Sequence, residues 1–113
     1  MHLQANLAEW LTAALGEETL NDPKARAMRV LEEAVELAQA VGIPPAKVVL
    51  QVNHTFARPP GEPSQEVAGV LNAALLAAHS LGKSGLRLGE AELQRAWRDM
   101  DLIREKNRTK VQA

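Results

Sequence analysis

The sequence has no cysteine and very few aromatic residues, and both absences restrict what the chain can be. Without cysteine, disulfides and thiolate metal sites are excluded. Aromatic residues make up 3% of the chain, namely Trp10, Phe56 and Trp97. The core must therefore be built from leucine, valine and many alanines, a composition that suits closely packed helices better than a sheet.

The sequence also lacks an excess of charge of either sign and any long hydrophobic run. Thirteen basic and fourteen acidic residues leave a net charge of -1, so nothing marks a protein that binds nucleic acid or a membrane surface. No apolar run reaches membrane-spanning length, and the N-terminus lacks a secretory pattern. The default expectation is a soluble, cytoplasmic protein.

The 113 residues suffice for one domain, residues 1–113, and for no second one of ordinary size. A chain this small buries roughly 60–70% of its unfolded surface, which leaves a monomer modestly stable and favours an oligomer.

Hydrophobic periodicity predicts five helices and no strand. We expect them at residues 3–15, 23–41, 45–57, 64–81 and 90–107. Gly16 and Gly42 are expected to end the first and second helices, and Asp22 and Ser64 to cap the second and fourth. Residues 83–89 are expected to form a connection. The fold class is therefore all-α, a four- to five-helix bundle.

The fourth predicted helix is apolar nearly all round. After Glu66 its only polar side chains are Asn72, His79 and Ser80. Such a helix is usually buried, so we expect it either at the centre of the bundle or at a subunit interface. Its alanines and Gly69 would allow neighbouring backbones to approach closely.

Two groups of glutamates are the strongest sign of function. Glu32, Glu33 and Glu36 lie on one face of the second helix, where like charges repel unless a cation neutralises them. Glu66 lies in the first turn of the fourth helix. Each has two readings: a solvated charge, favoured near a helix N-terminus in the case of Glu66, or part of a magnesium site built between two helices.

The motif Glu32-Glu33-Ala34-Val35-Glu36, followed about thirty residues later by Glu66-Val67-Ala68-Gly69, resembles the MazG-like all-α nucleoside triphosphate pyrophosphohydrolases. The run Arg58-Pro59-Pro60-Gly61-Glu62 also looks like a phage and bacterial subgroup with glycine in place of the second-motif aspartate. The likeness covers residues 25–81. It implies a MazG-like homodimer, or a dimer of dimers, that acts on nucleotides.

The resemblance implies hydrolysis of a nucleoside triphosphate to a monophosphate and pyrophosphate, with Mg²⁺, or alternatively Mn²⁺, as cofactor. The metal ligands would be Glu32, Glu33, Glu36 and Glu66, and either Glu33 or Glu36 would be the catalytic proton acceptor. Candidate substrate contacts are Asn72, Arg104 and Lys106. A buried, hydrogen-bonded amide at Asn72 and helix-end charges at the other two are the alternatives.

Gly69 departs from the family pattern, because one carboxylate ligand is missing. Water, Glu62, Asp99 or Asp101 could replace it. Alternatively, the chain is a catalytically impaired bundle that binds a nucleotide or a protein partner. A third reading is a structural dimer whose acidic face is only solvated.

Overall fold

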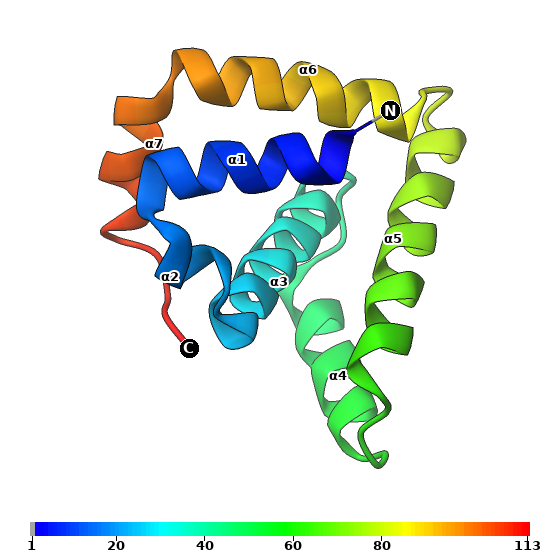
Figure 1. The fold of residues 1–113 in the computed structure, drawn as a ribbon. Coiled ribbons are helices and arrows are strands. Elements are labelled where there is room, and N and C mark those ends of the chain that lie inside the picture. Colours follow the sequence, from blue (N-terminus) through cyan, green and yellow to red (C-terminus); the bar gives the residue numbers. More distant parts are fainter. Residues whose placement is uncertain (1) are drawn as a thin grey trace.

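The computed structural model describes residues 2–113, and every regular element within them is a helix (Figure 1). The seven helices are α1 (Leu3–Leu15), α2 (Glu17–Leu20), α3 (Pro23–Ala40), α4 (Pro45–Phe56), α5 (Pro63–Ser80), α6 (Gly85–Arg98) and α7 (Met100–Asn107). This confirms the all-α class. The MazG-like bundle and the dimer stay predictions.

The ends of α3 follow from local chemistry, as expected. The side-chain Oδ1 of Asp22 accepts hydrogen bonds from the backbone N–H groups of Lys24 and Ala25, at 3.1 and 3.2 Å. Pro23 occupies the first turn, where its missing N–H costs nothing. Beyond the other end, Gly42 has φ of 88°, a conformation that other residues rarely adopt.

Ser64, the expected cap of α5, is wrong by two positions, and the helix begins at Pro63. Glu62 is the N-cap, and its Oε2 accepts a hydrogen bond from the Gln65 N–H at 3.0 Å. Hydrogen bonds from the backbone N–H groups of Ser64 and Gln65 lower the pKa of Glu62. Pro63 then stands at the first helical position, where its fixed φ is already helical.

The connection expected at residues 83–89 is also largely helical. Ser84 caps α6, with its Oγ accepting from the Arg87 N–H at 3.4 Å, so the helix begins at Gly85. The fifth predicted helix is instead two helices, because the backbone leaves helical geometry at Asp99 (φ -103°, ψ 24°) before α7. The short α2 was not expected from the sequence.

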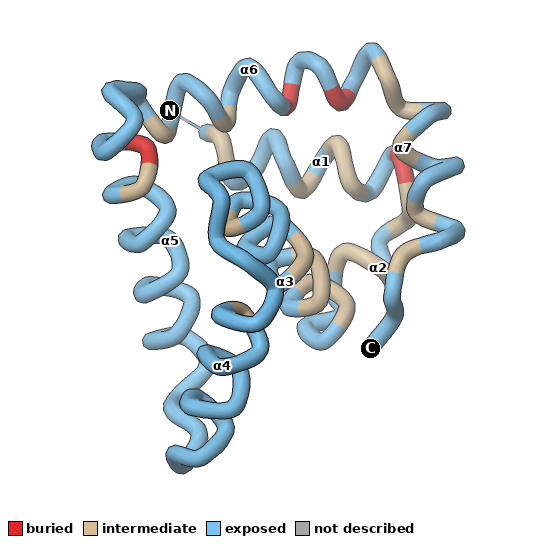
Figure 2. Tube along the Cα trace, turned by 180° about the vertical axis from the view of Figure 1, so that it is seen from behind, coloured by how far each residue is buried: buried red, intermediate tan, exposed pale blue. Residues whose placement is uncertain are grey.

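Four helices, α1, α2, α6 and α7, form a packed group, and α3, α4 and α5 make few contacts with it. α1 packs against α2, α6 and α7, and this group holds three of the four buried residues, Ala14, Leu93 and Ala96 (Figure 2). Among the described helices, the backbone of α5 comes close only to α6, where Ala78 is buried, and that of α4 only to α3. Gly85 permits the α5–α6 contact, because a Cβ there would lie 2.7 Å from Leu75 Cδ2.

Most apolar side chains of α3, α4 and α5 remain in solvent. On α3 the exposed ones are Val30, Leu31, Val35 and Leu37, on α4 Val49, Leu50, Val52 and Phe56, and on α5 Val67, Val70, Leu71, Leu75 and Leu76. We call this surface the open face. The expectation of a buried central helix at 64–81 is not met within one chain, because most side chains of α5 are exposed and its backbone comes close to no described helix except α6.

None of the helices in residues 2–113 combines the length and apolar character needed to cross a membrane.

Arg104 joins α7 to the end of α1. Its Nε donates to the Ala14 carbonyl and its Nη2 to the Ala13 carbonyl, both at 2.9 Å. These carbonyls belong to the last turn of α1, where a positive charge also interacts favourably with the helix dipole.

We expect Arg104→Ala to lower the free energy of unfolding by about 1–2 kcal/mol, because two charge-assisted hydrogen bonds are lost. Urea denaturation measures this. Arg108→Ala is the control: Arg108 is largely exposed and pairs only with Glu105, one turn earlier, so a loss below about 0.5 kcal/mol is expected. Equal effects of the two changes would contradict the role given to Arg104.

Candidate functional site

The candidate site is the acidic stripe of α3, formed by Glu32, Glu33 and Glu36. Although Glu33 as a residue is largely exposed, partial burial of its carboxylate is the largest cause of a raised pKa. The charges of Glu36 and Glu32 raise the pKa of Glu33 further. Within residues 2–113 neither Glu33 nor Glu36 has an ion pair. The two carboxylates repel each other, and a bound cation would remove that repulsion.

Glu32 already has cationic partners. Lys110 Nζ lies 2.6 Å and Arg29 Nη1 3.1 Å from Glu32 Oε1. The hydrogen bond from Lys110, more than any other cause, lowers the pKa of Glu32. Lys110 belongs to the segment after α7, residues 108–113, so this ion pair ties that segment to α3.

A second contact fixes the same segment: Arg29 donates a hydrogen bond to the Val111 carbonyl. Val111 also lines a small hollow of about 300 Å³ together with Met28, Glu32 and Glu36. An ammonium group thus occupies one end of the acidic stripe, close to where the sequence suggests a metal ion.

Basic side chains precede the acidic ones along the same helix. Arg26, Arg29, Glu33 and Glu36 follow each other at spacings of three and four residues, which places them on one side of α3. The pKa of Arg26 is lowered mainly by burial and, to a smaller extent, by the nearby charge of Arg29. The stripe therefore combines groups that attract phosphate with groups that attract a cation.

Glu66 lies apart from this stripe in one chain. Its carboxylate stands over Gly61, where an added Cβ would lie 3.3 Å from Glu66 Cδ. α5 has no close backbone approach to α3, and no three acidic or histidine side chains in residues 2–113 are grouped as metal ligands. The predicted four-carboxylate site is therefore not assembled within a single chain, and it stays a prediction.

The residues considered as replacements for the missing ligand are engaged elsewhere. Glu62 caps α5, Asp99 pairs with Arg95 at 3.4 Å, and Asp101 pairs with Arg104 at 3.3 Å. Gly69 is surrounded by open space, since an added Cβ would meet nothing within 4 Å. Close packing does not explain this glycine within one chain.

The three candidate substrate contacts, Asn72, Arg104 and Lys106, do not form one site in the structure either. Asn72 is exposed on α5, so the buried amide considered for it is not formed in one chain. Lys106 is exposed on α7. Arg104 lies in the last turn of its own helix, as the helix-end reading expected. Its guanidinium is bound to the end of α1, which that reading did not include.

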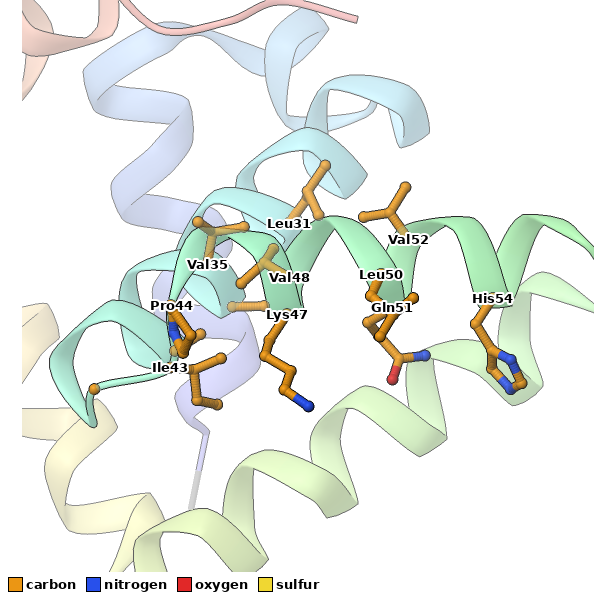
Figure 3. A pocket seen from close by; sticks show the side chains of 13 residues that line it. Leu31, Val35, Ile43, Pro44, Lys47, Val48, Leu50, Gln51, Val52 and His54 are labelled. Atoms are coloured by element: carbon orange, nitrogen blue, oxygen red, sulfur yellow. The ribbon is translucent and has the colours of Figure 1, made fainter.

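A larger groove lies beside α3, and none of the candidate residues lines it. It encloses about 920 Å³ between α3 and α4, with Leu31, Val35 and Val48 among its apolar lining (Figure 3). Lys47 and His54 lie at its rim. No acidic residue lines it, so it offers an apolar surface and no cation site.

The sequence did not reveal the two cationic partners of Glu32, Arg29 and Lys110. The i,i+3 spacing of Arg29 and Glu32 could have revealed the first. Lys110 is 78 positions from Glu32, and no local pattern announces a contact at that distance.

We expect Glu36→Gln to raise the melting temperature by about 1–3 °C at pH 7 with metal chelated, because an i,i+3 repulsion of about 0.2–0.5 kcal/mol is removed. The raised pKa of Glu33 means that the folded chain holds its proton more tightly than the unfolded chain. Stability therefore falls as pH rises through that pKa, and the gain should vanish in acid.

Glu92→Gln is the matched control. Its hydrogen bond to Arg95 lowers the pKa of Glu92, so this variant should lose stability at pH 7. Calorimetry between pH 3 and 8 compares the two variants, and a stabilising effect of equal size in both would refute the carboxylate repulsion.

Comparison of the chain with protein-family models, with curated proteins and with solved structures finds no match.

Proposed function

We propose that the protein is a Mg²⁺-dependent nucleotide pyrophosphohydrolase that converts a nucleoside triphosphate to a monophosphate and pyrophosphate. The observation that carries the proposal is that the neighbouring carboxylates of Glu33 and Glu36 repel each other and have no cationic partner within residues 2–113. The same helix also carries Arg26 and Arg29. The motif resemblance supports the same activity. Mn²⁺ is the alternative cation.

The residues of α3 fit one half of a magnesium site. Glu33 and Glu36 supply carboxylate oxygens, the ligands that Mg²⁺ prefers, and Glu32 adds a third carboxylate once Lys110 withdraws. Glu66 would complete the set only if α5 of the same or another chain came to lie against α3. When bound, the metal neutralises phosphate charge and acidifies a coordinated water.

The remaining tasks fall to side chains of this chain. Whichever of Glu33 and Glu36 is less engaged would accept a proton from the attacking water. Arg26 would hold phosphate oxygens through its guanidinium group, and Arg29 would do so once it leaves Glu32 and the Val111 carbonyl. Asn72, on the same helix as Glu66, stays the proposed contact to base or sugar, and Lys106 stays a proposed phosphate contact.

The second candidate is a catalytically impaired bundle that binds a nucleotide or a protein partner. The open space at Gly69 favours it, because no carboxylate replaces the absent one within the chain. Such a protein would still bind nucleotide at the acidic stripe, and it would release no pyrophosphate.

We expect the natural protein to release pyrophosphate from at least one nucleoside triphosphate in the presence of Mg²⁺ or Mn²⁺. Glu36→Gln should reduce the rate at least about 100-fold, because one group of the metal site is lost. Glu105→Gln, a change in an exposed glutamate of α7, should leave the rate unchanged.

A natural protein that binds a nucleotide in calorimetry without turnover would support the second candidate instead. Undiminished turnover in Glu36→Gln would refute the assignment of the site.

We expect Lys110→Gln to bind Mg²⁺ or Mn²⁺ more tightly, by up to about fivefold, because removing one partly exposed ion pair of Glu32 is worth up to about 1 kcal/mol. Isothermal titration with each cation measures this without substrate. Lys106→Gln is the control, since Lys106 has no ion pair in the structure. Weaker metal binding in Lys110→Gln would show that the lysine does not compete with the cation.

A further inference from the structure

The segment after α7 contacts both kinds of charged group that the proposed site uses. Lys110 Nζ lies 2.6 Å from Glu32 Oε1, and the Val111 carbonyl accepts a hydrogen bond from the Arg29 guanidinium. The two contacts join residues 78 and 82 positions apart, so helix periodicity does not impose them. Tertiary folding therefore brings this segment to the acidic stripe.

Each contact resembles one that a metal ion and its phosphate ligand would make. The Lys110 ammonium places a positive charge on a carboxylate, as a divalent cation would. The Val111 carbonyl oxygen accepts from a guanidinium, as a phosphate oxygen would. The two groups come from consecutive residues, and their partners, Arg29 and Glu32, form an i,i+3 pair on α3. One short segment therefore reproduces a cation and an oxyanion side by side.

The segment is held weakly enough to be displaced. The side chains of Lys110 and Glu32 are 24% and 30% exposed, and partly exposed ion pairs contribute little to stability. Val111 is 72% exposed and stands at the edge of the hollow that Glu36 lines. Residues 111–113 form no regular structure. Such a segment opens at a much lower free-energy cost than the packed helices.

The turn that directs the segment back to α3 is formed by local hydrogen bonds. Thr109 Oγ1 donates to the Lys106 carbonyl at 3.0 Å, and the Lys110 N–H donates to the Asn107 carbonyl at 3.4 Å. Both bonds join residues three positions apart, so they can persist when the Lys110–Glu32 pair breaks. A displaced segment would then stay near the acidic stripe and could return to it.

We propose that residues 108–113 are an inhibitory segment, in which the Lys110 ammonium holds the place of the cation and the Val111 carbonyl holds the place of a phosphate oxygen. A cation and a phosphate-bearing ligand that bind together at α3 displace the segment, because they need Glu32 and Arg29. This inference rests on the proposed function, since it names the regulation of the same site.

The chain lacks cysteine, so a single thiol can carry a label that reports the segment. We expect the fluorescence anisotropy of a dye on Gln112→Cys to fall when Mg²⁺ and inorganic pyrophosphate are added, because the segment leaves α3. A dye on Leu102→Cys, within α7, is the control and should show no change. An equal fall at Gln112→Cys in sodium chloride of the same ionic strength would overturn the proposal, because screening alone would then release the segment.

Lys110→Gln removes the charge that the segment places on Glu32. In the labelled Gln112→Cys chain, this change should lower the anisotropy before any ligand is added and abolish most of the further fall. Binding of Mg²⁺ with pyrophosphate, measured by calorimetry, should tighten by up to about fivefold. Lys106→Gln is the matched control, because it removes the same charge from an exposed lysine that has no ion pair in the structure. It should change neither quantity.

Binding and displacement are measured without turnover, so failure of this inference can be told from failure of the proposed function. Calorimetric binding of Mg²⁺ and pyrophosphate to the natural protein without a change in anisotropy would overturn the inhibitory segment and leave the proposed function standing. Displacement without hydrolysis of any nucleoside triphosphate would support the segment and refute the enzymatic activity. Absence of binding in both the natural protein and Lys110→Gln would refute both.

Discussion

The burial of the apolar sides of α3, α4 and α5 is the constraint on which the rest of this molecule depends. Within residues 2–113, these helices approach the other helices closely only at the α2–α3 and α5–α6 contacts, and α3 also contacts the segment after α7 through Lys110 and Val111. Hydrophobic burial is the main term that offsets the loss of chain entropy. A second copy would provide that burial, and it would also decide how α5 lies relative to α3, and therefore where Glu66 stands with respect to the acidic stripe.

Electrostatics and packing place opposite demands on α3. Its apolar side lines the groove and forms part of the open face. Its acidic side places the like charges of Glu33 and Glu36 close together. Lys110 neutralises part of this charge from a distant point of the chain. The acidic side of α3 therefore keeps a repulsion that a half-buried lysine compensates only in part.

Local structure was largely predictable. Asp22-Pro23 and Gly42 predicted the two ends of α3 correctly, because capping and positive φ depend on a few adjacent residues. The errors had local causes too. At α5 a glutamate served as cap one residue before a proline, and at Asp99 a break divided two helices whose hydrophobic pattern continues across it.

The sequence by itself determined the helical class, most helix boundaries and the acidic stripe, since each depends on residues within a turn or two of one another. Only the tertiary structure decided that Arg104 caps α1, that Lys110 pairs with Glu32, and that α5 stands away from α3. The two contacts join residues 78 to 91 positions apart, and their strength is set by packing and desolvation. No periodicity in the chain encodes them.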